Sequence, residues 1–365
     1  MMINKQSIYY WLFFPLLVLL SAGSLTSCIY DSVLEEEDNN TGHTYLTITT
    51  RGIDVGDNTD FEDYVGSLRV MAFDSQGKIV SGVNFTIDDL SDYEVYGTGD
   101  DTYITVEQEI QGGIMTSGTY SFYFVANETG YNTTNGILSE VLETVKTEDE
   151  LKSIQVKTDF SQEACKPNAT NMLMSVGPLK VLIREGENNE IGNANNRIEL
   201  IRAFAKAQLL LKVESGVTVP TSTAVSLSVP APNFFYLLPG KEEEIMSTTS
   251  LSYSVAESED NSLMNTELKA DDYFFISKVV YLPERYLSNS TNTQENAVKY
   301  QITLDNTGYP APIADNTTDN LDYSIKRNYA YTTIGTYAPA SEATVTLNWQ
   351  VKPYDNVNVD VPTFE

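Results

Sequence analysis

The chain has 365 residues and a formal net charge of −29, which comes from 51 acidic and 22 basic side chains. Such an excess of negative charge argues against nucleic-acid binding and against charge-driven docking on anionic lipid headgroups. The length is sufficient for two ordinary domains, each with a sizeable core. We therefore expect a two-domain protein that has no nucleic-acid partner.

Residues 1–27 have the features of a secretory signal peptide. One basic residue, Lys5, precedes an apolar run from Ile8 to Leu20, and this run is shorter than the roughly 20 residues of a bilayer-spanning helix. The run leads to the stretch Leu25-Thr26-Ser27-Cys28, which resembles the bacterial lipobox. We expect Cys28 to become the lipidated first residue after signal cleavage. The alternative is a secretory cleavage site between small residues, with a cysteine there by chance.

An acidic tether is expected behind this cysteine. The run from Glu35 to Asp38 and the polar residues up to Gly42 are typical of flexible chain. The acidic run is similar to the export signal that sends some Bacteroidota lipoproteins to the outer face of the outer membrane, and the alternative is a plain solvated linker. Because Cys28 is assigned to the lipid, the second cysteine, Cys165, is expected to be an unpaired packing thiol.

The stretch from Tyr45 to Arg51 is predicted to be a β-strand that is later removed. Leu46 and Ile48 alternate with hydroxyl-bearing residues, the pattern of a half-buried strand. After Arg51-Gly52 comes a segment rich in Asp, Gly and Asn, an exposed loop in which a trypsin-like protease could reach the arginine. A cut there would take an edge-most strand from a β-sandwich and leave an apolar groove for a neighbour's strand. The alternative is that Arg51 is only a solvated residue at a strand end.

The residue types argue against catalysis. The single histidine, His43, lies upstream of Arg51, so a chain cut after Arg51 contains no imidazole. That removes serine-histidine, cysteine-histidine and histidine-ligated zinc chemistry together. No pair of carboxylates stands out from the general background of Asp and Glu. We expect no enzyme, no catalytic residue, no metal site and no cofactor.

Residues 52–216 are predicted to form a first β-sandwich domain. Short alternating segments are separated by turn signals, and the expected strands are Ser67–Asp74, Lys78–Ile87, Tyr103–Ile110, Gly118–Ala126, Leu179–Glu185 and Ile198–Val213. The last of them is long enough to close the domain. Between Ile137 and Ile154 the apolar residues fall at helical spacing, and Thr147 with Glu150 resembles a capping box. We therefore expect a short helical crossover in this domain.

Residues 217–365 are predicted to form a second β-sandwich domain. The expected strands are Ala224–Val229, Phe234–Leu238, Tyr273–Leu282, Val298–Leu304, Asn328–Tyr337 and Ala343–Trp349. The polar stretch 241–271 is expected to be a long excursion over the surface.

The C-terminal stretch from Val357 to Phe364 is predicted to be a strand that is donated to another copy of the chain. Val357, Val359 and Val361 fall on one face and match the apolar face of the removable strand. The tail of one copy is therefore expected to fill the groove in another. The alternative is that this strand pairs within its own sheet.

Several segments, taken in this order, resemble the fimbrillins of Bacteroidales type V pili, the family of major and minor fimbrial subunits. They are Leu25–Cys28, the Arg51 junction, Leu68–Gly77, Asn171–Ser175, Arg202–Lys206, Tyr281–Arg285, Ile325–Tyr329 and the segment around Trp349. The resemblance runs along most of the chain. It implies an all-β fold with two tandem transthyretin-like β-sandwich domains.

The resemblance also implies how the precursor is processed and assembled. Such proteins reach the outer membrane as lipoproteins, an extracellular Arg-specific protease removes a propeptide, here residues 28–51, and a C-terminal strand of the adjacent subunit fills the groove. Repeated head to tail, this gives a filament. The corresponding positions are the lipid site Cys28, the scissile bond Arg51-Gly52, the removable residues Leu46 and Ile48, and the donor residues Val357, Val359 and Val361.

Stalk, anchor and tip subunits share this fold, so the role needs a separate argument. An anchor would keep its lipid and lack a cleavable junction, and a tip would carry an adhesive module or lack a donor tail. Arg51 and the Val-rich C-terminus favour a stalk subunit that serves adhesion. Its expected partners are further copies, anchor and tip pilins, the Arg-specific protease and, before the cut, the outer membrane through Cys28. The alternatives are an anchor or tip role, or a surface lipoprotein that binds glycan or host protein.

Overall fold

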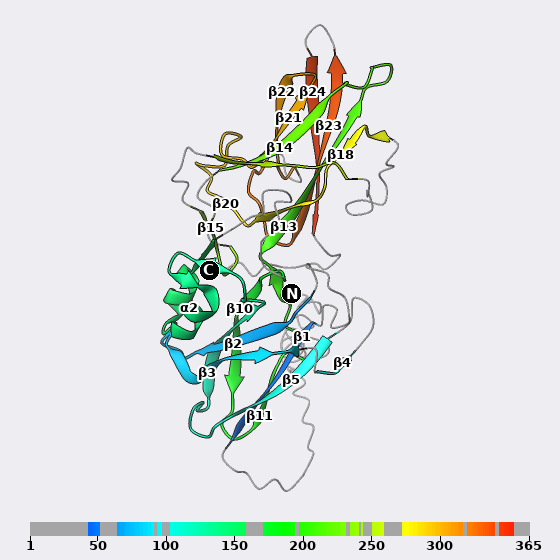
Figure 1. Ribbon diagram of the computed structural model, residues 1–365. Helices are drawn as coiled ribbons and strands as arrows, with labels where there is room; N and C mark the ends of the chain where they lie inside the picture. The colour runs from blue at the N-terminus through cyan, green and yellow to red at the C-terminus, as the bar shows by residue number, and fades with distance from the viewer. Residues whose placement is uncertain are drawn as a thin grey trace, which may run out of the picture. The chain divides into compact units, whose positions relative to one another are not determined.

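The structure is a computed structural model. The residues that the structure describes are 43–51, 64–90, 93–96, 103–157, 171–193, 197–230, 234–240, 242–243, 250–258, 272–316, 320–339 and 343–353. Their secondary structure is mainly β (Figure 1). They form two β-sandwiches with separate hydrophobic cores, so the predicted all-β fold with tandem sandwiches is confirmed.

The first sandwich packs a four-stranded sheet and a five-stranded sheet around one core. The four-stranded sheet has, in spatial order, β11 (Asn188–Ile191), β1 (Thr44–Arg51), β5 (Tyr103–Ile110) and β4 (Val95–Tyr96). The five-stranded sheet has β12 (Ile201–Arg202), β10 (Met174–Ile183), β6 (Gly118–Ala126), β2 (Ser67–Phe73) and β3 (Ile79–Asp88). Apolar side chains of both sheets are buried in this core, at alternate positions in β5 and at nearly every position in β2.

The β2–β3 hairpin forms as predicted. The Asp74 carboxylate accepts hydrogen bonds from the backbone N–H groups of Gln76 (2.8 Å) and Lys78 (3.0 Å). Gly77 has a φ of 70°, which the turn requires and which glycine adopts without steric cost. Both faces of β2 are apolar, and β2 lies between β6 and β3, as that pattern indicates.

The predicted helical crossover is confirmed as two short helices, α2 (Leu138–Thr144) and α3 (Glu148–Ser153). Their leucines at positions 138, 142 and 151 are buried in the first core. The capping box is present: the Thr147 hydroxyl accepts from the Glu150 N–H and the Glu150 carboxylate accepts from the Thr147 N–H, both at 3.2 Å. A small sheet beside the helices has the order β15 (Phe234–Tyr236), β9 (Gln155–Lys157), β7 (Asn132–Thr133) and β8 (Gly136–Ile137).

Replacing the capping threonine should weaken this crossover. Thr147→Ala leaves the Glu150 N–H without its acceptor, and we expect a loss of about 1 kcal/mol in the free energy of unfolding. Chemical denaturation followed by circular dichroism measures the change. Thr134→Ala is the matched control, because the exposed Thr134 caps no helix. Equal effects of the two substitutions would show that the cap contributes nothing.

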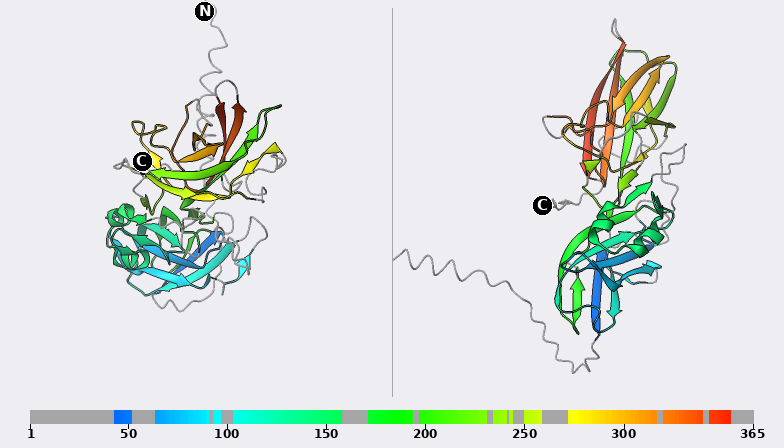
Figure 2. Two further views of the ribbon diagram at one scale, coloured as in Figure 1. Left: turned by 45° about the horizontal axis from the view of Figure 1, so that its top comes forward. Right: turned by 90° about the vertical axis from the view of Figure 1, so that its left-hand side faces the viewer.

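The second sandwich has its own core, formed between two further sheets. The first of these sheets has β18 (Phe275–Ile276), β13 (Phe204–Val213), β23 (Tyr329–Pro339) and β24 (Ala343–Pro353), and β19 (Val280–Pro283) also pairs with β13. The second has β17 (Ser250–Ser254), β14 (Thr223–Pro230), β21 (Lys299–Leu304) and β22 (Thr307–Pro312). A separate pair joins β16 (Glu242–Glu243) to β20 (Tyr286–Leu287). Figure 2 shows β23 and β24 as a long orange and red hairpin.

One predicted strand does not close the first domain. Ile198 and Phe204 pack in the first core, but Leu209 and Leu211 of β13 pack in the second core. The reason is that β13 pairs in parallel with β23 along its length. The expectation for 198–213 was therefore wrong in its C-terminal part, whereas the domain limits 52–216 and 217–365 stay predictions.

A buried arginine joins segments that pack on different cores, since Leu237 belongs to the first core and Leu282 and Ile325, which flank Glu284 and Arg327, belong to the second. Arg327 donates to the Glu284 carboxylate at 2.8 Å and to the carbonyl oxygens of Tyr236 (2.7 Å) and Leu237 (3.1 Å). It also donates to the Ser175 hydroxyl at 3.2 Å. The Arg327 side chain is 2% exposed and that of Glu284 is 5% exposed, so this ion pair is shielded from water.

Candidate functional site

The strand that ends at Arg51 lies inside its sheet. β1 pairs with β5 in antiparallel orientation from Thr44↔Ile110 to Arg51↔Tyr103. On its other side it pairs with β11 in parallel from Tyr45↔Asn188 to Ile48↔Ile191 (Figure 1). The prediction of an edge-most strand was therefore wrong. β1 fills a slot between two strands, and we call the space that it occupies the β1 slot.

The inward face of β1 is part of the first core. Leu46 and Ile48 are 0% exposed, as their alternation predicts, and Thr50 is also fully buried. Ile48 lies opposite Val106 on β5 and Ile191 on β11, and both of these are buried. The two apolar side chains of β1 thus occupy positions that stay lined by β5 and β11 if β1 leaves.

Further hydrogen bonds join β1 to the β11 side of the slot. The Tyr45 N–H donates to the Glu187 carbonyl at 3.1 Å, and the Ile198 N–H donates to the Thr49 carbonyl at 2.9 Å. The Thr47 hydroxyl donates to the Asn188 side-chain oxygen at 2.8 Å. An incoming strand would therefore meet backbone and side-chain partners along this wall.

The outer end of β1 is beside an aromatic pair. Arg51 is the last residue of the strand and pairs with Tyr103. The Tyr103 ring stacks on Tyr96 with 5.4 Å between ring centroids, and the guanidinium carbon of Arg197 lies 5.7 Å from the Tyr103 centroid. A hydrogen bond to the Glu94 carboxylate raises the pKa of the Tyr96 hydroxyl. A protease that cuts after Arg51 would therefore act where the β1–β5 ladder ends.

Several predicted site residues lie outside the part of the chain that the structure describes. These are the lipid site Cys28, the scissile-bond residue Gly52, the thiol Cys165 and the donor residues Val357, Val359 and Val361. The nearest described element to the donor residues is β24. It pairs with β23 from Ala343↔Pro339 to Pro353↔Tyr329, so the predicted strand 343–349 is confirmed and extends to Pro353.

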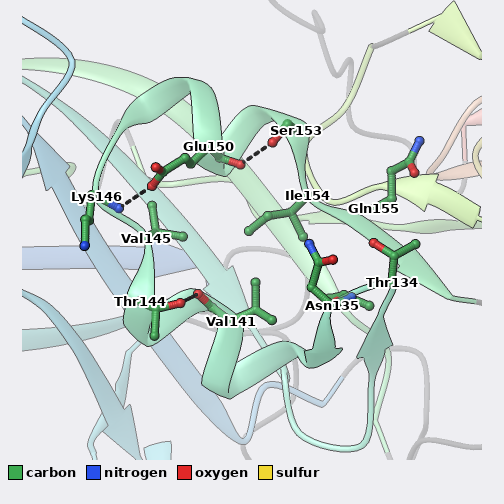
Figure 3. Close-up of a pocket in the computed structure, with 11 residues that line it drawn as sticks. Thr134, Asn135, Val141, Thr144, Val145, Lys146, Glu150, Ser153, Ile154 and Gln155 are labelled. Carbon is green, nitrogen blue, oxygen red and sulfur yellow. Dashed lines mark hydrogen bonds between the residues drawn. The ribbon is translucent and has the colours of Figure 1, made fainter.

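A hollow of about 340 Å³ lies beside α2 and α3. Figure 3 shows three of its polar side chains, those of Thr144, Glu150 and Ser153, hydrogen-bonded to the backbone of the helix ends. The Glu150 carboxylate accepts from the Lys146 N–H at 2.7 Å, the Ser153 hydroxyl donates to the Glu150 carbonyl at 2.8 Å, and the Thr144 hydroxyl donates to the Val141 carbonyl at 2.9 Å. These bonds stabilise the helices, and we place the functional site at the β1 slot.

Two further features of the described residues concern metal binding and membrane insertion. No group of three or more His, Cys, Asp or Glu side chains in these residues is arranged to hold a metal ion. None of the helices in the described ranges is long and apolar enough to cross a membrane.

Comparison with known proteins places the chain in a family. Residues 34–228, more than half of the chain, match the family described as "Major fimbrial subunit protein (FimA)". The chain belongs to this family. No curated protein matches it. As a member of the fimbrial subunit family it is a structural protein and not an enzyme, it assembles with other pilin subunits, and it acts in a pilus at the cell surface.

Solved structures share the fold of this fimbrial subunit. The tip fimbrial protein Mfa3 from Porphyromonas gingivalis, solved with a C-terminal truncation, is 16% identical with a TM-score of 0.55. The alignment covers 85% of this chain and 99% of that one. A putative cell adhesion protein from Parabacteroides distasonis is 17% identical with a TM-score of 0.50, covering 86% of this chain and 97% of that one. At these identities the likeness concerns the fold alone.

The sequence did not predict β11, which forms one side of the β1 slot. The alternation of β1 indicated which side chains are buried, but the partner strand β11 was not expected. Its sequence, Asn-Asn-Glu-Ile, has one apolar residue and no strand pattern. The only signal was the glycine on each side of it, Gly186 and Gly192, which indicates turns.

Proposed function

We propose that this fimbrial subunit forms the stalk of the pilus and polymerises by strand exchange. β1 is excised by a cut between Arg51 and Gly52, and the C-terminal strand Val357–Phe364 of the next copy takes its place. Each copy then receives one strand and donates one, so the chain of contacts is head to tail and does not close.

The observation that carries this proposal is the position of β1. Its buried side chains belong to the first core, and strands pair with it on both sides. Excision would uncover apolar side chains of the core and two strand edges together, and unpaired edges readily accept another strand. A loop or an edge strand would leave a smaller vacancy.

The donor tail has the side chains that this slot needs. Val357, Val359 and Val361 alternate, as Leu46 and Ile48 do in β1. Burial of three such side chains contributes roughly 4.5 to 9 kcal/mol at about 1.5 to 3 kcal/mol each. The cost of ordering a free tail is subtracted from this gain, and main-chain hydrogen bonds to the slot add to it.

The export route follows from the N-terminal segment. The chain is secreted as a lipoprotein, and lipid on Cys28 holds the precursor on the outer face of the outer membrane. An extracellular Arg-specific protease then separates the body from residues 28–51 and from the lipid. The mature subunit begins at Gly52 and is released into the extracellular pilus, where it serves adhesion.

Substitution of Arg51 tests the proposed cut. Arg51→Gln removes the side chain that an Arg-specific protease recognises, so we expect full-length protein and no SDS-resistant multimers after protease treatment. Arg184→Gln, at an arginine whose side chain is exposed, is the matched control and should be cut and polymerise normally. Gel electrophoresis and the mass of the new N-terminus give the result. A chain that is cut after Arg51 but stays monomeric would contradict strand exchange.

A tip role is the second candidate, because the tip protein Mfa3 shares the fold over 85% of this chain. The two roles differ in the use of the C-terminal tail. A stalk subunit donates its tail to the next copy, so purified and cut protein should form long multimers without other subunits. A tip subunit has no copy beyond it and would give no multimers of its own.

A further inference from the structure

Among the described residues, β11 has a ladder with β1 alone. The turn before it, Arg184–Glu187, is held by its own bonds: the Arg184 N–H donates to the Asn189 side-chain oxygen at 2.8 Å, and the Asn189 amide donates to the Arg184 carbonyl at 3.0 Å. Loss of β1 therefore removes the ladder partner of β11. It also removes two bonds of the turn to β1, from the Gly186 N–H to the Thr44 hydroxyl (3.2 Å) and from the Tyr45 N–H to the Glu187 carbonyl (3.1 Å).

Glycines bound this strand on both sides. Gly186 has a φ of 76° and Gly192 a φ of 79°, a region of backbone space in which glycine is not strained. Residues that absorb backbone rotation at the two ends of a short element are the usual hinges of a moving segment. Between the hinges, Asn188 and Glu190 are exposed, and Ile191 is buried beside Ile48.

The direction of β11 suits a ladder with β5. β11 runs parallel to β1, and β1 runs antiparallel to β5, so β11 is antiparallel to β5. The strands on the two sides of the slot are about 10 Å apart, twice the usual strand spacing. A shift of about 5 Å, one strand spacing, would bring β11 into an antiparallel pair with β5.

We infer that β11 closes the β1 slot after β1 has left, and that the incoming donor strand must displace it. This inference rests on the proposed excision of β1. Closure places Ile191 opposite Val106, where Ile48 lies before the cut, because both Ile191 and Val106 are paired with Ile48. The cut subunit then hides its apolar vacancy and its free strand edges until a donor strand arrives. β11 is thus an autoinhibitory strand that prevents cut subunits from pairing with strands other than the donor strand.

A disulfide across the slot tests this closure. Asn188 and Glu109 both pair with Tyr45, from opposite sides. In the uncut chain, cysteines at these two positions are about 10 Å apart, beyond the roughly 7 Å limit between Cα atoms for a disulfide. After closure they face each other. The experiment uses the full-length chain with Asn188→Cys, Glu109→Cys and Cys165→Ser, cut at a protease site inserted at Gly52 so that the natural protease is not needed.

We expect the disulfide in most cut molecules and in almost no uncut ones, measured by mass spectrometry under mild oxidation at low protein concentration. A synthetic peptide of residues 43–51, added in excess before oxidation, should suppress it by refilling the slot. Asn188→Cys with Thr105→Cys is the control, because Thr105 lies about 14 Å along β5 from Glu109.

Two results would overturn the inference. One is a cut chain that has lost the β1 peptide, as its native mass shows, and still forms no disulfide, which means that the slot stays open. The other is a disulfide of equal yield before and after the cut. Failure of the proposed function is seen separately, because it appears as missing cleavage at the unmodified Arg51 junction or as missing multimers, whereas the disulfide is measured on single subunits.

Discussion

Ile48→Ala is expected to destabilise the uncut subunit by about 2–5 kcal/mol and to leave the assembled pilus unchanged. Ile48 is 0% exposed and lies between Val106 and Ile191 in the first core, so its truncation opens a cavity there. If β1 is excised as proposed, the subunits of the pilus lack β1 and therefore lack the substituted residue. Chemical denaturation of the precursor and heat dissociation of the multimers in detergent measure the two effects.

Val106→Ala is the matched control for this prediction. Val106 is 1% exposed and stays in the subunit after the cut, so its truncation should weaken the precursor and the pilus alike. If Ile48→Ala also lowered the dissociation temperature of the multimers, β1 would still be present in the pilus. That outcome would contradict excision of the strand.

Arg327→Met is expected to reduce the free energy of unfolding by about 3–5 kcal/mol. The substitution leaves the Glu284 carboxylate buried without its cation, and it removes the donor to the Tyr236 and Leu237 carbonyl oxygens. These groups belong to segments that pack on different cores, so the two sandwiches should also unfold less cooperatively. Calorimetry of the cut and uncut protein measures both the midpoint and the number of transitions.

The control variants for the buried pair separate lost charge from lost contact. Arg327→Met combined with Glu284→Leu should be less destabilised than Arg327→Met alone, because no unpaired charge remains in the interior. Arg184→Met, at an arginine whose side chain is 64% exposed, should change stability by less than about 1 kcal/mol. Equal losses for the single and the double variant would show that the ion pair is not what holds this region.

Local patterns in the sequence predicted local structure well. The capping box of Thr147 and Glu150 is formed by residues three positions apart, and it is present where expected. The alternation of Leu46 and Ile48 gave the buried face of β1, because a strand places every second side chain on the same side.

Long-range pairing could not be predicted in the same way. The partner of β1 on its parallel side is β11, roughly 140 residues further along the chain, and the polar sequence of β11 has no strand signal. β13 was expected in the first domain because the predicted strand 198–213 is long enough to close that domain. Its parallel ladder with β23 decides the question, and nothing in the residues of β13 alone indicates that ladder.

The site was predicted in part for the same reason. The strand, its buried residues and the position of Arg51 at its end are features of one short segment. That the strand lies between two others, and so leaves a slot with two edges, depends on the packing of distant segments. This difference strengthens the functional proposal, because an inner strand leaves a larger vacancy than an edge strand.

Cross-linking in mixed pili tests the exchange of strands most directly. Pili are assembled from equal amounts of unlabelled and heavy-isotope-labelled subunits that carry a photoreactive residue in place of Val359. The account predicts cross-links from position 359 to β5 or β11, with mixed-isotope pairs as frequent as same-isotope pairs. If the two peptides in every cross-link carried the same isotope label, the tail would stay with its own chain. That result would contradict the account.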